Sequence, residues 1–221
     1  YLQNFHFQTD GWLSDRSAEL YDTQVETLFS GLADTMRRRA LPPLADALRG
    51  RVRRSHVLDI ACGTGRFLGE VKRNWPRLKV TGLDLSPHYL AEAGRHLAPW
   101  SRVELLEGKA EAIPLASGSV DAATAIFLFH ELPRKVRAAV AAEIARVLKP
   151  GGAFVLVDSL QKGDRPALDP LIEAFPRLFH EPYYADYATS DLEALFGAAG
   201  LRLRATERAF MSKVMVFGHS T

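Results

Sequence analysis

The feature that most constrains the fold is a hydrophobic strand pattern that runs directly into a glycine turn and then into a helix pattern. Residues 57–67 read VLDIACGTGRF, with Gly63 and Gly65 in the turn. In open α/β sheets, ligands bind beyond the carboxyl end of the first strand, where glycines let the backbone approach and a helix N-terminus presents its amides. The pattern therefore predicts a site for a nucleotide-like ligand beside this turn.

The remainder of the first 160 residues predicts helices followed by a parallel sheet. Apolar residues recur at helical spacing from Leu20 to Met36, and Pro42 stops the pattern before a second short helix that runs through Leu48. From Ser55 onward, short β-rich runs alternate with amphipathic helix patterns, which predicts βαβ units with right-handed crossovers. The expected strands cover 55–60, 78–83, 102–107, 120–129 and 153–158, and the expected helices cover 65–74, 86–98 and 133–148.

The end of the chain predicts an antiparallel hairpin. Residues 159–189 are rich in aromatic residues and proline and too long for an ordinary connection, so we expect an irregular lid there. A capping box from Ser190 to Glu193 predicts a further helix that ends near residue 200. The runs 201–207 and 210–218 are separated by too few residues for a crossover helix, so we expect them to pair antiparallel.

These elements predict an α/β fold with a seven-stranded Rossmann-like sheet. With 221 residues the chain can bury a core without metals or cross-links. We expect residues 1–50 to form an N-terminal helical cap within the same domain as a core of residues 51–221, which carries the lid insertion 159–189.

Composition and charge argue against several functional classes. No run approaches the roughly 20 apolar residues of a membrane span, and we recognise no signal peptide, so the cytoplasm is the expected location. The single cysteine, Cys62, excludes an internal disulfide and a cysteine-built zinc site, and we expect no metal. Arginines cluster at 37–39 and 51–54, but short basic runs at helix ends are more often solvated, so we do not expect a nucleic-acid partner.

Three observations together indicate a nucleoside cofactor other than a dinucleotide. A dinucleotide fingerprint needs a small residue three positions after the second glycine, and Leu68 stands there. Asp84 ends the second expected strand about twenty residues beyond the turn, where a carboxylate can accept both ribose hydroxyls. The terminal hairpin also differs from a dehydrogenase, which would continue with a second parallel half.

Five motifs in order make the chain resemble the class I S-adenosylmethionine-dependent methyltransferases, and within them the small-molecule group of ubiquinone/menaquinone C-methyltransferases. The motifs are AELYD at 18–22, LDIACGTG at 58–65, GLDLS at 82–86, GKAEAIP at 108–114 followed by SVD at 119–121, and LKPGG at 148–152. The likeness covers nearly the whole chain from Ala18 onward, and the family's fold also ends in an antiparallel hairpin.

The resemblance implies S-adenosylmethionine as cofactor and S-adenosylhomocysteine as product. The residues that it places around the cofactor are Tyr21, Asp59, Ala61, Gly63, Gly65, Asp84, Leu85, Ala110, Glu111 and Phe127. Asp84 would hold the ribose, and Asp59 would orient the glycine turn or reach the methionine ammonium through water. The chain departs from the family at Lys109, where an aspartate often accepts a hydrogen bond from the adenine amino group. Lysine has no acceptor, so Glu111, a backbone carbonyl or packing would have to substitute.

Two histidines are candidate catalytic residues. Methyl transfer is an in-line displacement that depends mainly on alignment, and a general base contributes where the acceptor must lose a proton. His130 follows the fourth expected strand and His180 lies in the lid; either could instead have a structural role, such as capping a helix. The aromatic residues that predict either an apolar acceptor pocket or ordinary core packing are Phe5, Phe7, Trp12, Phe175, Phe179, Tyr183 and Tyr184.

We therefore expect methyl transfer from S-adenosylmethionine to a small, apolar or aromatic molecule. One alternative is a protein or RNA methyltransferase that docks through the arginine clusters. Another is a non-catalytic S-adenosylmethionine-binding module, for which Lys109 is the only support. The oligomeric state stays open, with a homodimer as one option.

Overall fold

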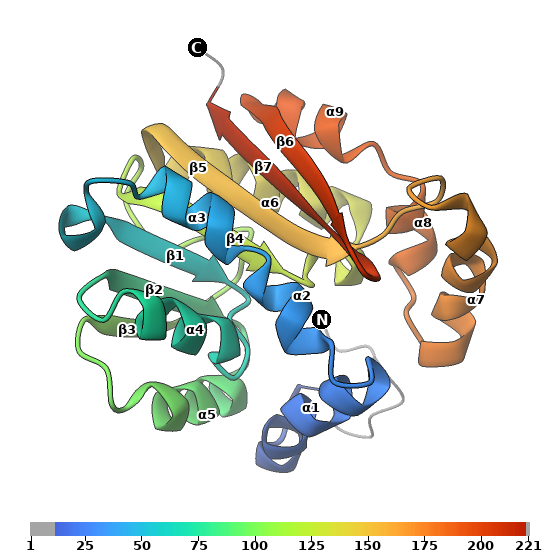
Figure 1. Ribbon diagram of the computed structural model, residues 1–221, viewed down its shortest axis with the longest axis horizontal. Helices are drawn as coiled ribbons and strands as arrows, with labels where there is room; N and C mark the ends of the chain where they lie inside the picture. The colour runs from blue at the N-terminus through green and yellow to red at the C-terminus, as the bar shows by residue number, and fades with distance from the viewer. Residues whose placement is uncertain (1–11, 220–221) are drawn as a thin grey trace.

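A computed structural model describes residues 12–219 and contains a seven-stranded sheet in the order β3-β2-β1-β4-β5-β7-β6 (Figure 1). The strands are β1 (His56–Ile60), β2 (Lys79–Asp84), β3 (Val103–Glu107), β4 (Val120–Ile126), β5 (Leu148–Ser159), β6 (Leu201–Ala209) and β7 (Ser212–His219). The first five strands are parallel, and β7 lies antiparallel between β5 and β6. The predicted α/β sheet with a C-terminal antiparallel hairpin is thus confirmed.

Helices cover both faces of the sheet. One face is covered by α3 (Leu41–Ala47), α4 (Arg66–Asn74) and α5 (Pro87–Leu97), and the other by α6 (Arg134–Val147) and α9 (Leu192–Ala198). On the first face, Leu68 of α4 packs in one cluster with Val57 and Val80 of the strands. On the second face, Ile144 of α6 packs in one cluster with Phe154. Successive strand residues therefore feed two separate cores, as the alternation of side chains along a buried strand requires.

The described part of the N-terminal cap is helical, as predicted. It consists of α1 (Asp15–Leu28), α2 (Ala33–Arg38) and α3, and the side chain of Ser14 caps α1 by accepting a hydrogen bond from the Ser17 amide. Figure 1 shows α1 beside α5, against which it packs. Two contacts tie this cap to the ends of β1 and β2: the Thr64 hydroxyl donates to Asp22, and the Ser86 hydroxyl donates to the carbonyl of Trp12.

The segment predicted as an irregular lid is largely helical, so that prediction was wrong in its detail. It contains a short 3-10 turn (η3, Pro166–Leu168), α7 (Asp169–Phe179) and α8 (Tyr184–Ala188). Leu160, Ile172 and Tyr184 form a small core of their own beside the sheet. The prolines at the first turn and at position 176 of α7 concealed the helix in the sequence, although Pro at a first turn is well tolerated.

Three element boundaries also differ from the sequence prediction. The capping box is wrong: Asp191 caps α9 by accepting from the Ala194 amide, while the Ser190 hydroxyl donates to the carbonyl of Asp186. Strand β4 ends at Ile126 because Phe127 adopts a left-handed φ of 57°, after which Phe129–Glu131 form a 3-10 turn (η2). Strand β5 begins directly at the end of α6 and includes the Pro-Gly-Gly segment.

Candidate active site

Two cavities lie at the carboxyl ends of the parallel strands and share part of their wall. The first, here called the glycine-turn cavity, has a volume of about 280 Å³ and is bounded by the ends of β1 and β2 and by the loops after β3 and β4. The second, here called the lid cavity, has a volume of about 500 Å³ and lies between α1, α7 and the segment after β4. Tyr21, Phe127 and Glu131 line both cavities. A molecule bound in one would therefore adjoin a molecule bound in the other.

The backbone of the glycine turn has positive φ angles and borders the glycine-turn cavity. Ala61 and Gly63 both have positive φ angles, of 56° and 54°, and both line the glycine-turn cavity. A Cβ atom added at Gly63 would meet no atom within 4 Å, so this backbone borders open space. Non-glycine residues with positive φ are uncommon, and here Ala61 and Phe127 directly follow the two neighbouring strands β1 and β4.

Gly65 has a different function in the turn. Its φ is 76°, and a Cβ atom added there would come within 3.0 Å of the Leu97 side chain and 3.1 Å of the Ala93 Cβ. Gly65 does not line the glycine-turn cavity. This glycine therefore allows the turn to pack closely against α5, whereas the family resemblance placed its backbone around the cofactor.

The Asp84 carboxylate is held at the edge of the glycine-turn cavity by two backbone amides. One carboxylate oxygen accepts from the Gly63 amide at 2.7 Å, and the other accepts from the Ser86 amide at 2.9 Å. Burial raises the pKa of Asp84, and the two amide hydrogen bonds partly oppose that rise. Each carboxylate oxygen has a second acceptor position, so the oriented group can still accept hydrogen bonds from a pair of ligand hydroxyls.

Most other predicted cofactor residues also border this cavity. Leu85, Ala110, Glu111, Tyr21 and Phe127 line it. The Tyr21 ring, presented by α1, packs on the Tyr89 ring with 5.2 Å between centroids. Burial raises the pKa of Tyr21, so its hydroxyl stays protonated.

Asp59 lies behind the cavity and does not line it. Its carboxylate is 2% exposed and accepts a hydrogen bond from the Thr124 hydroxyl at 2.6 Å, which joins β1 to β4. Burial raises the pKa of Asp59 to about 7, although the Thr124 bond acts in the opposite direction. Burial likewise raises the pKa of the Cys62 thiol, which keeps it protonated.

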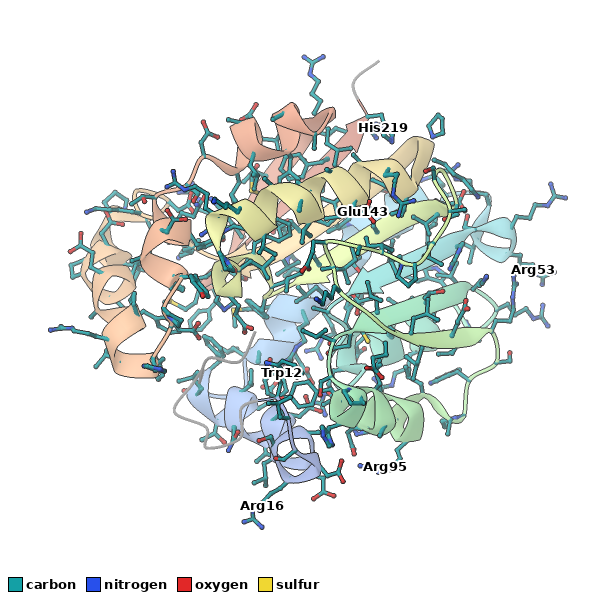
Figure 2. The ribbon with its side chains drawn as sticks, turned by 180° about the vertical axis from the view of Figure 1, so that it is seen from behind. Trp12, Arg16, Arg53, Arg95, Glu143 and His219 are labelled. Atoms are coloured by element: carbon teal, nitrogen blue, oxygen red, sulfur yellow. The ribbon has the colours of Figure 1, made fainter. Side chains whose placement is uncertain are left out.

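Sequence reasoning missed several residues of the glycine-turn cavity. Tyr89 and Glu131 line it, and so do Trp12 and Tyr183, for which the sequence left open an acceptor pocket or core packing. Lys109, which the family resemblance placed near the adenine, lines it as well. Figure 2 labels Trp12 where α1 approaches α5. Tyr89 had a usable signal, because it is an aromatic residue in the first turn of the helix that begins beside Asp84. The departure from the family pattern at Lys109 therefore lies at the cavity itself.

The lid cavity is mainly apolar, with a polar group at its inner end. Phe175, Phe179 and Tyr184, for which the sequence left open an acceptor pocket or core packing, line this cavity, and the Phe175 ring lies 4.7 Å from the Tyr184 ring. The same alternatives were open for Phe5 and Phe7, which lie outside the described residues. The polar residues of the wall include His130, Glu131, Ser159 and Glu181. Its size and mixed wall suit a small molecule with an apolar body.

His130 is paired with a buried carboxylate. Its Nδ1 lies 2.6 Å from Asp158 Oδ1, and Asp158, which is fully buried, also accepts from the amides of Phe129 and Ser159. Burial by itself lowers the pKa of His130. The charge and hydrogen bond of Asp158, together with the charges of Glu181 and Glu131, outweigh that effect and raise the pKa to about 9. The imidazole is therefore mostly protonated at neutral pH.

The structure does not bring His180 to the site. It is the left-handed residue, with φ of 54°, that ends α7, and its side chain is exposed and lines neither cavity. The next residue, Glu181, enters the lid cavity instead. Helix ends commonly use such a left-handed residue, which explains the position of His180 without a role in chemistry.

The two arginine clusters differ in their exposure to solvent. Arg37, in the first arginine cluster, is buried in an ion pair with Asp34 at 2.7 Å and so does not present its charge to solvent. Figure 2 shows Arg53 of the second cluster at the edge of the molecule.

Within residues 12–219, no helix is long and apolar enough to cross a membrane. The same residues contain no group of three or more His, Cys, Asp or Glu that could hold a metal ion.

Comparisons with known proteins identify what this chain is similar to. Residues 57–152 match the family profile of a methyltransferase domain. The ubiquinone/menaquinone biosynthesis C-methyltransferase UbiE of Syntrophotalea carbinolica is 35% identical over 167 residues, which are 75% of this chain and 67% of that protein. UbiE of Methylobacterium nodulans is 36% identical over 164 residues, 72% of this chain and 62% of that protein. The chain thus spans about two thirds of the length of these relatives or less.

A solved structure supports the fold. Human N-acetylserotonin methyltransferase in complex with SAM superposes with a TM-score of 0.69 at 18% identity, over 94% of this chain and 57% of that one. At this level of identity the likeness speaks for a shared architecture.

Proposed function

The chain belongs to the S-adenosylmethionine-dependent methyltransferases, and from this membership we propose that it transfers a methyl group to a small apolar or aromatic molecule. The observation that carries the proposal is the pair of cavities that share Tyr21, Phe127 and Glu131. One cavity suits a nucleoside and the other an apolar acceptor, so donor and acceptor would meet at the shared wall. An aromatic ring such as that of the quinones named for the relatives is a fitting acceptor for the lid cavity.

Residues of the glycine-turn cavity fit the cofactor by their chemistry. Asp84 would bind the ribose hydroxyls, and the backbone of Ala61 and Gly63 would face the methionine end. Leu85 and Ala110 would contact the adenine. When bound, S-adenosylmethionine supplies a reactive methyl group on a positively charged sulfur.

The protein's own contribution is alignment, exclusion of water and control of a proton. Holding the reactants in a near-attack arrangement can supply about 7 to 11 kcal/mol of the barrier. Tyr21 on α1 would close the shared wall, and the aromatic residues of α7 and α8 would exclude water from the acceptor. We propose that the His130–Asp158 pair handles a proton at the inner end of the lid cavity, with Asp158 orienting the imidazole.

Two measurements test the proposed function. Calorimetric titration should show binding of S-adenosylhomocysteine, and radiolabelled S-adenosylmethionine should pass its methyl group to 1,4-naphthohydroquinone or a related phenol. Cofactor binding without transfer to any member of an acceptor panel would favour a non-catalytic binding module instead. Failure to bind S-adenosylhomocysteine would overturn the proposal altogether.

A further inference from the structure

Two hydroxyl groups lie side by side in the wall of the lid cavity. Ser159 is the last residue of β5, and Tyr184 is the first residue of α8. Their hydroxyl oxygens are 2.5 Å apart, and both residues line the lid cavity. This contact, here called the Ser159–Tyr184 pair, therefore joins the sheet to the lid beside the space that an acceptor would occupy.

The main chain of Ser159 is fixed next to His130. The Ser159 amide donates to Asp158 Oδ1 at 2.7 Å, and its carbonyl accepts from the Tyr187 hydroxyl at 2.6 Å. Asp158 Oδ1 also lies 2.6 Å from His130 Nδ1, so one carboxylate oxygen positions both the imidazole and Ser159. A ligand group that binds the Ser159 hydroxyl would therefore be held at a defined place relative to the His130 ring.

The Ser159–Tyr184 pair has more hydrogen-bonding capacity than its own contact uses. Each hydroxyl carries one donor hydrogen and two acceptor positions. One hydrogen lies between the two oxygens, and the only other printed partner within residues 12–219 is the Leu160 carbonyl, 3.3 Å from Ser159 Oγ. That distance exceeds the range of about 2.5 to 3.0 Å that is usual for O–H···O bonds. The second hydrogen is therefore available to a ligand.

The surroundings of the pair direct this unused hydrogen toward the cavity. Ser159 is partly exposed, although Asp158 before it and Leu160 after it are fully buried, so its exposed part faces the cavity that it lines. The Tyr184 ring packs on the Phe175 ring with 4.7 Å between centroids, a contact that phenylalanine would make equally well. Burial raises the pKa of the Tyr184 hydroxyl to about 12, so this hydroxyl keeps its proton. Packing thus needs neither hydroxyl, whereas a polar ligand group would use them.

We propose that the Ser159–Tyr184 pair determines acceptor specificity by donating a hydrogen bond to an oxygen substituent on the acceptor ring. The assignment deepens the proposed function, on which it rests, by naming the group on the acceptor that the lid cavity recognises. A hydroxyl or carbonyl oxygen can accept this bond, whereas a ring without oxygen leaves the second hydrogen without a partner, which costs affinity. Because Asp158 fixes Ser159 relative to His130, the same bond orients the ring toward the imidazole.

Two probes of nearly equal shape isolate this hydrogen bond. They are 2-naphthol and 2-methylnaphthalene, which carry a hydroxyl and a methyl group at the same ring position. Each is titrated into the protein saturated with S-adenosylhomocysteine. A change in affinity that is confined to 2-naphthol reports the hydrogen bond, whereas a disturbed lid would weaken the binding of both probes.

The double variant Ser159→Ala, Tyr184→Phe removes both hydroxyls together and so leaves neither without its partner. Replacing both members of a hydrogen bond by apolar groups has little effect on stability, so this variant should fold. It should bind 2-naphthol about two- to tenfold more weakly, the range expected for one hydrogen bond, and 2-methylnaphthalene as tightly as the wild type does. Tyr184→Phe alone, which keeps the Ser159 hydroxyl, should retain part of the discrimination.

Thr189→Val is the matched control. Thr189 directly follows α8, and its exposed hydroxyl donates to main-chain carbonyls of that helix and lines neither cavity. Removal of this hydroxyl should leave the affinities for both probes unchanged. Thermal unfolding checks that each variant is folded.

The proposal is overturned if the double variant binds 2-naphthol as tightly as the wild type does, if the folded double variant binds both probes equally more weakly, or if neither probe binds the wild type. Failure of the proposed function is a different result. A protein whose double variant loses affinity for 2-naphthol alone, yet which transfers a methyl group to no acceptor, would retain the pair as a binding site and lose the enzymatic function.

Discussion

Asp84 is the single side chain whose removal should most affect cofactor affinity. The Asp84→Ala substitution removes a carboxylate that is aimed by two amides at the glycine-turn cavity. Loss of charged hydrogen bonds to the ribose should weaken S-adenosylhomocysteine binding by about 1.5 to 3 kcal/mol. Calorimetric titration measures this change, and unchanged affinity would refute the ribose assignment. Asp84→Asn removes the charge but keeps one acceptor oxygen. It therefore distinguishes the loss of the charge from a change in the fold of the turn.

His130 should make the turnover rate depend on pH in the alkaline range. With its pKa raised to about 9, only about one molecule in a hundred has a neutral imidazole at pH 7. If the neutral imidazole accepts the acceptor's proton, turnover should rise with pH until about pH 9 and then level off. The charged groups that raise this pKa are Asp158 on β5, Glu181 before α8 and Glu131 on η2, and the rings of Tyr184 and Tyr187 on α8 pack against the imidazole.

A pH–rate profile of the wild type and two variants tests this behaviour. Asp158→Asn removes the group that raises the pKa most, so the rise should move to lower pH. His130→Gln should have lower turnover and lack the rise, while binding S-adenosylhomocysteine normally. Full activity in His130→Gln would assign His130 a structural role.

Asp59 should destabilise the folded protein at neutral and alkaline pH in the absence of ligand. Its pKa is 3.8 ordinarily and about 7 in the folded protein, so the folded state holds this proton more tightly than the unfolded state. Stability is therefore lost as the pH rises from about 4 to about 7 and is not regained above that range. Asp59→Asn keeps an acceptor for Thr124 and should raise the melting temperature at pH 8 more than at pH 5.

Among the elements, the sequence predicted the ones whose pattern is local and repetitive. The strand pattern before Gly63 and the acidic end of β2 at Asp84 were both recognisable, and both lie beside the cavity as expected. Helix α7 was missed because Pro170 and Pro176 interrupt its pattern, although neither stops the helix. The cap of α9 was misplaced by one residue, because the hydroxyl of Ser190 is used by the adjoining segment.

The residues of the candidate site show the same contrast between local sequence patterns and tertiary packing. Asp84 could be assigned from its position at a strand end relative to the glycine turn, and Ala61 from the resemblance of that turn to the family motif. Glu181 could not, because its entry into the cavity depends on the left-handed backbone of His180 and on how α7 packs against the rest of the lid. Gly65 shows a further limit, since its close contact with α5 depends on tertiary packing that no motif encodes.

Arg137 of α6 should hold the lid helices in place. Its side chain is 1% exposed and donates to the carbonyl of Leu132, to the Ser190 hydroxyl and to the Asp186 carboxylate. Arg137→Met leaves these acceptors without their buried donor and should lower the free energy of unfolding by about 1.5 to 3 kcal/mol. Hydrogen exchange should accelerate over residues 184–190.

Arg134→Met provides the matched control for that prediction. Arg134 pairs with the same Asp186, but its side chain is 75% exposed. An exposed pair of this kind contributes little, because water screens the charges, so the variant should change stability little. Equal effects of the two substitutions would show that burial of Arg137 is not what secures the lid.

At the scale of the whole molecule, the cap and the core meet beside the glycine-turn cavity. Asp15 of α1 lies 2.7 Å from His88 of α5, and Arg66 of α4 reaches Asp34 of α2. Together with the bonds of Thr64 and Ser86, these contacts connect the cap to the turn and helices that surround the glycine-turn cavity. We therefore propose that the cap works as part of one domain with the core and that its movement governs exchange of the cofactor.

Thr64→Val tests whether the cap controls that exchange. The Thr64 hydroxyl lies 3.0 Å from both carboxylate oxygens of Asp22, and valine has nearly the same shape without the hydroxyl. Loss of one hydrogen bond of about 0.5 to 1.5 kcal/mol should make opening easier and speed S-adenosylhomocysteine release by about two- to tenfold. Stopped-flow displacement measures the release rate, with Thr35→Val, an exposed position on α2, as the control.

The association rate must be measured as well, because Thr64 also lies within the glycine turn. If the hydrogen bond holds the cap closed, its loss changes both the association rate and the release rate. If Thr64 instead contacts the cofactor, its loss raises the release rate alone. Equal release from Thr64→Val and the wild type would mean that the cofactor leaves without movement of α1.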